Sequence, residues 1–276
     1  MSETAPITLL TDFGESDWFV GSMKGVIAGI SPRSRVIDIT HRVAPGDIVG
    51  AGLVLRCAYP AFPPGTVHLA VVDPGVGTAR AVLVAEGDGY VFIAPDNGLL
   101  SSVFSALEEM TVFRAERREL FREKISDTFH GRDIFAPLAA RIAAGFPPRE
   151  AGPELAEPVI LPPPVCRQGR GGRWEAEIIF IDHFGNCLTS IRRETVEKDG
   201  AGPRLAGVEL QSEEEKIFFP LTGAYSAVPA GNPCSVWGSC GYLELSVNGE
   251  DAAGRFGLER GSRIELEIKT GQSGKA

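Results

Sequence analysis

Short apolar, β-branched runs alternate with helical patterns through the first half of the chain. The predicted strands are residues 7–10, 36–39, 67–72, 81–85 and 91–94. Residues 18–29 and 47–58 space apolar side chains at helical intervals, the second stretch following the turn residues Pro45 and Gly46. This alternation is typical of a mostly parallel, Rossmann-like sheet covered by helices, so we expect an α/β domain over residues 1–150.

The second half of the chain is predicted to form short strands with little helix between them. The predicted strands are residues 175–181, 208–210, 216–220, 235–237, 243–247 and 263–268. Turn signals separate them, which predicts an all-β domain over residues 174–276, a small antiparallel barrel. The triple proline at residues 162–164 and the glycines that follow it indicate a Pro/Gly-rich linker over residues 151–173.

Length and composition narrow the class of protein. At 276 residues two domains are expected, and 43% hydrophobic with 23% charged residues is ordinary for a globular chain. No apolar run reaches the roughly 18–20 residues of a membrane span, and the first residues lack a secretory signal, so we expect a soluble, cytoplasmic protein.

The net charge of −9 argues against nucleic acid as a partner and favours a small molecule. Five cysteines without a C-x-x-C pair indicate neither a disulfide framework nor a zinc site.

Two carboxylates follow the first predicted strand, at the turn into the first helix. Asp12 can accept both hydroxyls of a ribose, and Asp17 can hold an ammonium group. A turn residue at Asp12 and a helix N-cap at Asp17 explain the same pattern without a ligand.

An acid and a base, Asp73 and Arg80, stand seven residues apart across a glycine turn after the most apolar strand. A dinucleotide-binding loop is rejected, because Arg80 occupies the place of its third glycine and a strand follows. Two interpretations remain: a charged pair facing a ligand crevice, or a salt bridge that pins the loop.

His130 lies between Phe129 and Gly131, just before a predicted helix whose N-cap we expect to be Asp133. Histidine changes protonation near neutral pH, so a loop histidine near an acid and an arginine can position and polarise a water molecule. A structural role is the alternative. A serine hydrolase built on Ser126 and His130 is disfavoured, since the nucleophile-elbow pattern is missing.

The run from Asp182 to Asn186 closes a strand with an acid, an aromatic ring and an amide. Phe184 can cover the face of an adenine and Asn186 can bond its edge, but a hairpin turn with one core phenylalanine has the same composition. Residues 96–98, Asp-Asn-Gly, are typical of a tight turn, and we interpret them as a turn before a ligand site.

Taken in order, these segments resemble the S-adenosylmethionine hydrolase (adenosine-forming) family, the hydroxide-using relatives of fluorinase and chlorinase. The motifs that carry the resemblance are T-D-F-G at 11–14 with Asp17, D-P-G-V-G-x-x-R at 73–80, F-H-G-R-D at 129–133, D-x-F-G-N at 182–186, and G-S-C-G-Y-L-E at 238–244 followed by Asn248. The resemblance extends from Thr8 to about Ile268, nearly the whole chain.

The resemblance implies hydrolysis of S-adenosylmethionine to adenosine and methionine, by in-line attack of water or hydroxide on the ribose C5′. It implies that Asp73, Arg80 and His130 hold the nucleophilic water and that Asp12 binds the ribose. Methionine would be bound by Asp17, Asp182 and Ser239; adenine would stack on Phe184 and Tyr225, with its edge met by Asn186 and the backbone near Asn248 and Gly249. No metal or cofactor besides the substrate is implied. The expected assembly is a homotrimer, with ligand between one subunit's N-terminal domain and a neighbour's C-terminal domain.

Four positions depart from the halogenating relatives. Cys240 stands where they carry an arginine, Phe19 where they have a serine, and Gly46 where they have a tryptophan. Asp73 replaces a tyrosine of the fluorinase, and a carboxylate there repels halide and favours water, so a hydrolase is preferred over a halogenase. Two further alternatives are a metal-dependent phosphohydrolase that uses Asp12, Asp73 and Asp96, and a non-catalytic protein that binds adenosine or S-adenosylmethionine.

Overall fold

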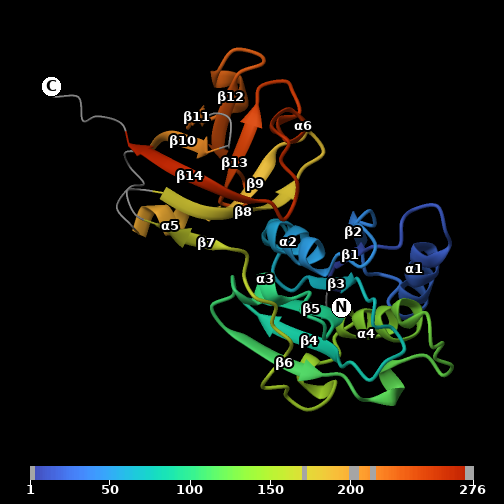
Figure 1. Ribbon diagram of the computed structural model, residues 1–276. Coiled ribbons are helices and arrows are strands. Elements are labelled where there is room, and N and C mark those ends of the chain that lie inside the picture. The colour runs from blue at the N-terminus through green and yellow to red at the C-terminus, as the bar shows by residue number, and fades with distance from the viewer. Residues whose placement is uncertain (1–3, 170–172, 199–204, 212–215, 271–276) are drawn as a thin grey trace. The chain divides into compact units, whose positions relative to one another are not determined.

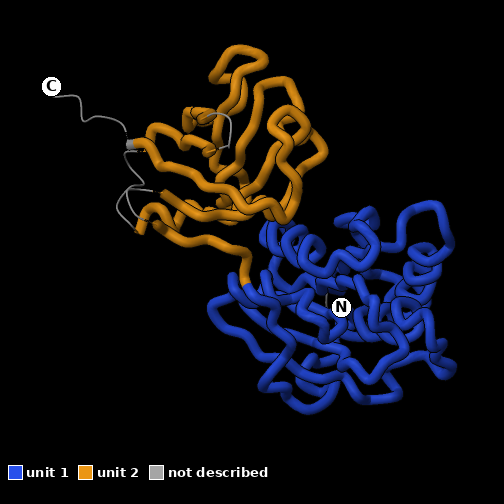
Figure 2. Tube along the Cα trace, viewed as in Figure 1, with its two compact units in different colours: residues 1–162 blue, residues 163–276 orange. Residues whose placement is uncertain are grey.

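The computed structural model describes residues 4–169, 173–198, 205–211 and 216–270. The chain divides into two compact units, Met1–Pro162 and Pro163–Ala276 (Figure 2). The division falls inside the triple proline. Within the described ranges, no helix combines the length and the apolarity needed to cross a membrane.

Unit 1 contains a six-stranded mixed sheet in the order β2-β1-β3-β5-β4-β6 (Figure 1). Its strands are β1 (Ile7–Thr11), β2 (Val36–Thr40), β3 (Val67–Val71), β4 (Val82–Gly87), β5 (Tyr90–Pro95) and β6 (Met110–Arg114). The strands β2, β1, β3 and β5 are mutually parallel, whereas β4 is antiparallel to both β5 and β6. The mostly parallel α/β domain predicted from the sequence is confirmed.

Helices cover both faces of this sheet because its strands are apolar on both sides. Along β1, Ile7 and Leu9 pack with helices α1 (Phe19–Ile30) and α4 (Ala136–Ala143). Leu10 lies in a second cluster with helices α2 (Ile48–Ala58) and α3 (Ser101–Phe104). Single turns of 3-10 helix lie at Tyr59–Ala61, Arg118–Leu120 and Pro148–Glu150, and a π-helical turn at Gly131–Phe135 leads into α4. A sheet buried on both faces places its ligand loops at the strand ends.

Unit 2 is an antiparallel sheet in the order β11-β10-β14-β8-β9-β13-β12, with β7 paired to β8. Its elements are β7 (Cys166–Gln168), β8 (Arg173–Ile181), β9 (Cys187–Arg192), α5 (Arg193–Lys198), β10 (Leu205–Gln211), β11 (Lys216–Pro220), a 3-10 turn (Tyr225–Ala227), β12 (Pro233–Trp237), β13 (Tyr242–Val247), α6 (Ala252–Phe256) and β14 (Arg263–Thr270). A bridge between Leu221 and Ser235 brings the two end strands together, which nearly closes the sheet into a barrel. The predicted all-β barrel is confirmed.

Much of the stretch whose composition indicates a linker is held by main-chain hydrogen bonds. Ala151 is fully buried in the core of unit 1. The N–H of Leu155 donates to the carbonyl of Val112 on β6, at 2.8 Å. Further along, β7 pairs with β8 in unit 2.

Candidate active site

Asp12 directly follows β1, and the backbone of Gly46 binds its carboxylate. The N–H of Gly46 donates to Oδ2 at 2.8 Å, and Gly46 has φ +74°, in the left-handed region. A carboxylate has about four acceptor positions, so this bond leaves capacity for ligand hydroxyls. Asp17 is exposed and lies one residue before Trp18, the N-cap residue of α1. The N-cap interpretation of Asp17 is therefore wrong.

Asp73 and Arg80 form a buried ion pair at the end of the neighbouring strand β3. The Nε of Arg80 lies 2.8 Å from both carboxylate oxygens, and its Nη2 also donates to Oδ2. The two side chains are only 4% and 9% exposed, and the guanidinium lies over the ring of Phe135 at 5.2 Å from its centroid. The salt bridge anticipated from the sequence is present, and it extends to a third group.

That third group is His130. Nη2 of Arg80 lies 3.0 Å from its Nδ1. A guanidinium can only donate, so Nδ1 accepts, and the neutral ring carries its proton on Nε2. Burial, and then the positive charge of Arg80, lower the pKa of His130, against the opposing charges of Asp73, Asp127 and Asp133. The imidazole is therefore neutral at pH 7, with an Nε2–H donor that can bind the oxygen of a water or hydroxide.

Two glycines allow the loops that carry these groups to approach each other. Gly77 has φ +82°, and a Cβ added there would lie 2.6 Å from the carbonyl oxygen of Asp127. A Cβ on Gly131 would lie 3.1 Å from the ring of Phe13, the residue after Asp12. The loop after β3 therefore rests on the loop before His130, and Gly131 rests on the loop after β1.

Asp133 is not a helix N-cap, contrary to the expectation from the sequence. Its carboxylate is fully buried and accepts from the N–H of Ser126 at 2.9 Å, from Arg132 Nε at 2.7 Å and from Arg122 Nη1 at 3.0 Å. Burial opposes ionisation, but the bonds from Arg132 and Ser126 prevail and lower the pKa of Asp133 to about 2. Asp133 thus connects the start of the His130 loop to the π-helical turn. In the sequence it is only an acid before an apolar run, and that pattern does not indicate this role.

An aromatic cluster adjoins His130 in unit 1. The ring of Phe19 lies 5.9 Å from that of Phe13 and 5.1 Å from that of Phe129, between centroids. Trp18, 70% exposed, lies over Phe19 at 5.3 Å. Phe19 thus packs against Phe129, the residue that precedes His130.

In unit 2, the Asp182 carboxylate organises its own loop. Oδ1 accepts from the N–H groups of Phe184 and Asn186 at 2.8 and 2.9 Å, and Oδ2 accepts from the Asn186 side chain at 2.8 Å. This is the hairpin turn that the sequence offered as the alternative. The turn nevertheless leaves the Phe184 ring 74% exposed, so the ring is not in the core and is free to cover a flat ligand.

The remaining predicted contacts of unit 2 lie in turns near β13. Tyr225 is 41% exposed and donates its hydroxyl to Glu244 at 2.7 Å. Ser239 lies in the turn between β12 and β13, with its Oγ 3.9 Å from the sulfur of Cys240. Asn248 donates from its amide to the carbonyl of Val228 at 2.7 Å, and Gly249 has φ +78° in the turn after β13.

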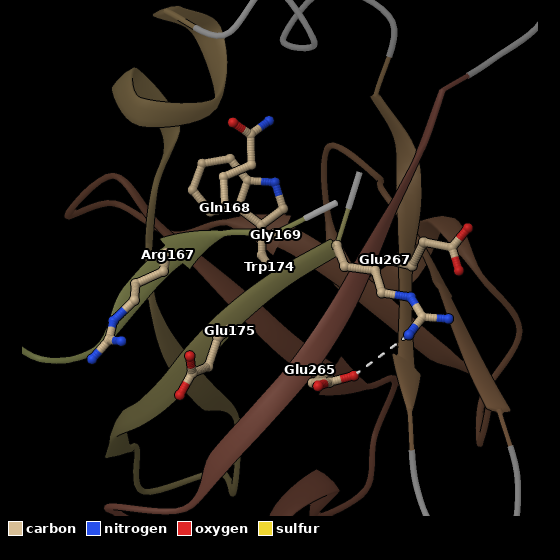
Figure 3. Close-up of a pocket in the computed structure, with 8 residues that line it drawn as sticks. Arg167, Gln168, Gly169, Trp174, Glu175, Glu265 and Glu267 are labelled. Atoms are coloured by element: carbon tan, nitrogen blue, oxygen red, sulfur yellow. Dashed lines mark ion pairs between the residues drawn. The ribbon is translucent and has the colours of Figure 1, made fainter. Parts of the chain in front are cut away.

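A separate cavity of about 730 Å³ lies on unit 2 (Figure 3). Residues of β7, β8 and β14, with Gly169, line it: Arg167, Gln168, Gly169, Arg173, Trp174, Glu175, Glu265 and Glu267. Two of these residues, Arg173 and Glu265 on adjacent strands, form an ion pair at 4.0 Å. Its lining is distinct from the predicted site residues of either unit.

The three acids proposed for a metal-dependent phosphohydrolase have separate partners. Asp12 binds the N–H of Gly46, Asp73 binds Arg80, and Asp96 accepts from the N–H of Val159 at 2.8 Å. Among the described residues, no group of three or more His, Cys, Asp or Glu side chains is arranged to hold a metal ion. The arrangement of side chains therefore does not support that alternative.

Residues 7–152 match the family described as SAM hydroxide adenosyltransferase N-terminal domain, and residues 176–265 match the corresponding C-terminal domain. A protein of Salinispora tropica named (R)-S-adenosyl-L-methionine hydrolase is 41% identical, over 96% of this chain and 99% of its own. One of the same name from Thermus thermophilus is 35% identical, over 95% and 99%. A fluorinase of Actinopolyspora mzabensis is 28% identical, over 94% and 96%. The crystal structure of an uncharacterized conserved protein from Thermotoga maritima superposes with a TM-score of 0.89 at 35% identity, over 95% of this chain and 99% of that one.

Proposed function

This chain belongs to the SAM hydroxide adenosyltransferase family, and from this premise we propose that it hydrolyses S-adenosyl-L-methionine to adenosine and L-methionine. The observation that carries the mechanism is the contact of Asp73, Arg80 and His130, brought together from two loops. Their arrangement suits the binding of one small oxygen nucleophile.

In the proposed reaction, hydroxide forms when a bound water gives its proton to solvent. The positive guanidinium of Arg80 lowers the pKa of that water, and Asp73 fixes the guanidinium. His130 donates from Nε2–H and orients the oxygen, because its Nδ1 is occupied by Arg80. The oxygen then bonds to the ribose C5′ while the C5′–S bond breaks, and the electron pair leaves with the methionine sulfur. In-line positioning supplies much of the rate enhancement, since the sulfonium is already a good leaving group.

Substrate binding is divided between the units in this proposal. From unit 1, Asp12 binds the ribose hydroxyls and Asp17 the methionine ammonium. From unit 2, the adenine stacks on Phe184 and Tyr225. The remaining contacts proposed for unit 2 are Asp182 and Ser239 to methionine, and Asn186, Asn248 and Gly249 to the adenine edge.

We further propose a homotrimer in which unit 1 of one subunit and unit 2 of a neighbour complete each site. The resemblance to the family implies this arrangement, and the proposed ligands lie in two compact units. Sedimentation should give three times the subunit mass. Mixing His130→Ala with Phe184→Ala protein under conditions of subunit exchange should restore activity, because some mixed sites then contain neither substitution.

The function is tested by incubating the protein with S-adenosylmethionine and separating the products by chromatography, with chloride and fluoride present. Release of adenosine and methionine supports the hydrolase. A 5′-halogenated nucleoside would indicate a halogenase, and binding without any product would indicate a sensor. The hydrolase is favoured over the halogenase because the Asp73 carboxylate repels a halide ion.

A further inference from the structure

Glu244 is a buried carboxylate in a strand that lies inside the sheet of unit 2. Strand β13 pairs with β12 on one side and β9 on the other, so Glu244 stands opposite Val236 and Leu188. Its sequence neighbours Leu243 and Leu245 pack in the core. Side chains alternate along a strand, so Glu244 points to the opposite face of the sheet. It is nevertheless only 8% exposed, and something must therefore cover it.

Two turns cover Glu244, and both carry residues proposed to bind substrate. Oε2 accepts from the hydroxyl of Tyr225 at 2.7 Å. Oε1 lies directly against Gly238, where an added Cβ would collide with it. Gly238 begins the turn that holds Ser239 and closes with the bond from Gly241 N–H to Gly238 carbonyl at 2.9 Å. The Glu244 carboxylate thus contacts both the Tyr225 ring, which is expected to stack on adenine, and the turn with Ser239, which is expected to bind methionine.

Tyr225 needs such a support. It lies in a single 3-10 turn, Tyr225–Ala227, whose three residues are exposed. A ring on an exposed turn rotates freely unless its polar end is fixed, and ordering it on binding costs affinity. The hydroxyl bond to Glu244 orders the ring before the ligand arrives.

The electrostatic surroundings agree with this bond. Burial, and then the charge of Asp182, raise the pKa of Glu244, while the hydrogen bond from Tyr225 lowers it. Burial, followed by the bond to Glu244, raises the pKa of Tyr225 well above its usual value, so the phenol remains a proton donor at any working pH.

We propose that Glu244 is a positioning residue that holds Tyr225 and the Gly238–Gly241 turn in the geometry that binds the nucleoside and methionine ends of the substrate. The inference rests on the proposed function, since it assigns a task to a residue of that same site. Glu244 acts through its neighbours and is not itself a catalytic residue.

The experiment compares Glu244→Leu, Tyr225→Phe and the double variant in S-adenosylmethionine hydrolysis and in adenosine binding by calorimetry. Loss of a hydrogen bond to a charged group is expected to raise KM and the adenosine Kd about tenfold in each single variant, with most of the change in KM and little in kcat. The double variant is expected to match Glu244→Leu, about tenfold rather than a hundredfold, because Tyr225→Phe removes only the bond that Glu244→Leu has already removed.

Two further variants separate positioning from general folding. Glu244→Gln keeps an acceptor for the phenol and is expected to retain most of the affinity. Glu197→Gln removes an exposed acid that binds Arg193 on α5, and is expected to leave KM unchanged. Thermal unfolding of each variant is measured. If Glu244→Leu does not fold, the KM and Kd values of Tyr225→Phe and Glu244→Gln test the positioning role instead.

Additive effects of the two substitutions, or an unchanged KM in Tyr225→Phe, would overturn the inference. Wild-type protein that binds adenosine but releases none from S-adenosylmethionine would overturn the hydrolase alone, and the Kd ratios would still test Glu244. Wild-type protein that binds neither compound would overturn both.

Discussion

Nη2 of Arg80 lies 3.0 Å from Nδ1 of His130, although fifty positions separate the two residues in the chain. The guanidinium has no acceptor, so this contact requires an unprotonated Nδ1. A protonated imidazole would direct Nδ1–H at a positive charge. The contact therefore exists only with the neutral ring, and His130 serves to orient the nucleophile through Nε2–H.

The first prediction is the pH dependence of kcat. Burial and Arg80 lower the pKa of His130 below its usual 6.5, so the neutral, competent ring predominates above that lowered pKa. With respect to this group, kcat is expected to be flat around pH 7 to 8 and to fall as pH decreases through a value below 6.5. A pH profile of wild-type kcat checks this. A limb with its midpoint at or above 6.5 that disappears in His130→Ala would contradict the assignment.

The second prediction concerns His130→Ala. Removing the group that orients the nucleophile is expected to lower turnover by about 10²-fold or more, and to remove the limb that His130 contributes to the profile. Adenosine affinity is expected to stay nearly constant, because adenine and ribose contacts come from other residues. Single-turnover kinetics with adenosine calorimetry measure both. Unchanged turnover would remove His130 from the mechanism.

The third prediction compares two glycines of the loop after β3. Gly77→Ala introduces a side chain at φ +82° and against the carbonyl of Asp127, which costs about 1–3 kcal/mol of backbone strain and separates the two loops. Small displacements of positioned groups can lower rates by up to about 10²-fold. Gly75→Ala, where an added Cβ makes only ordinary contacts at 3.6 and 3.8 Å, is the matched control. Equal turnover in both variants would show that the close approach of the loops is dispensable.

The fourth prediction is that turnover persists in EDTA. The carboxylates at the strand ends already have partners in Gly46 and Arg80. We propose that the substrate alone is sufficient, without metal or cofactor. Dialysis against EDTA, followed by adenosine assay with and without added Mg²⁺ or Zn²⁺, measures this. If EDTA abolished activity and an added metal restored it, the result would support the metal-dependent phosphohydrolase instead.

Much of this site follows from local sequence patterns. Apolar runs identify β1 and β3, and the acids that follow them mark the edge where ligand loops gather. The pairing of Asp73 with Arg80 is likewise suggested by their spacing across a glycine turn. Patterns of this kind depend only on neighbours in the chain, which is why they can be read without coordinates.

Other features depend on partners that are distant in sequence. Strand β9 was not predicted. Its buried residues include Thr189, whose hydroxyl donates to the carbonyl of Leu243 at 2.9 Å, fifty-four positions away. The bond between Tyr225 and Glu244 likewise crosses nineteen positions. A polar residue whose partners lie far along the chain carries no local signal of its burial.

The last prediction is the stability of Asp133→Asn as a function of pH. The folded pKa of Asp133 is lowered to about 2, below its unfolded value of about 3.9. A depressed folded pKa contributes stability that is fully present above the unfolded pKa and is lost as pH falls through the folded pKa.

At pH 7 the variant Asp133→Asn leaves two arginines facing a neutral amide and is expected to lose about 3–5 kcal/mol of unfolding free energy. As pH falls from about 4 to 2, the wild type should lose about 2–3 kcal/mol of this advantage, the free energy that a shift of about two pKa units represents, and approach the variant. Urea unfolding followed by circular dichroism measures both, with Asp127→Asn, an exposed acid of the same loop, expected to differ from wild type by less than about 0.5 kcal/mol. A constant gap between Asp133→Asn and wild type down to pH 2 would show that folding does not lower the pKa of Asp133.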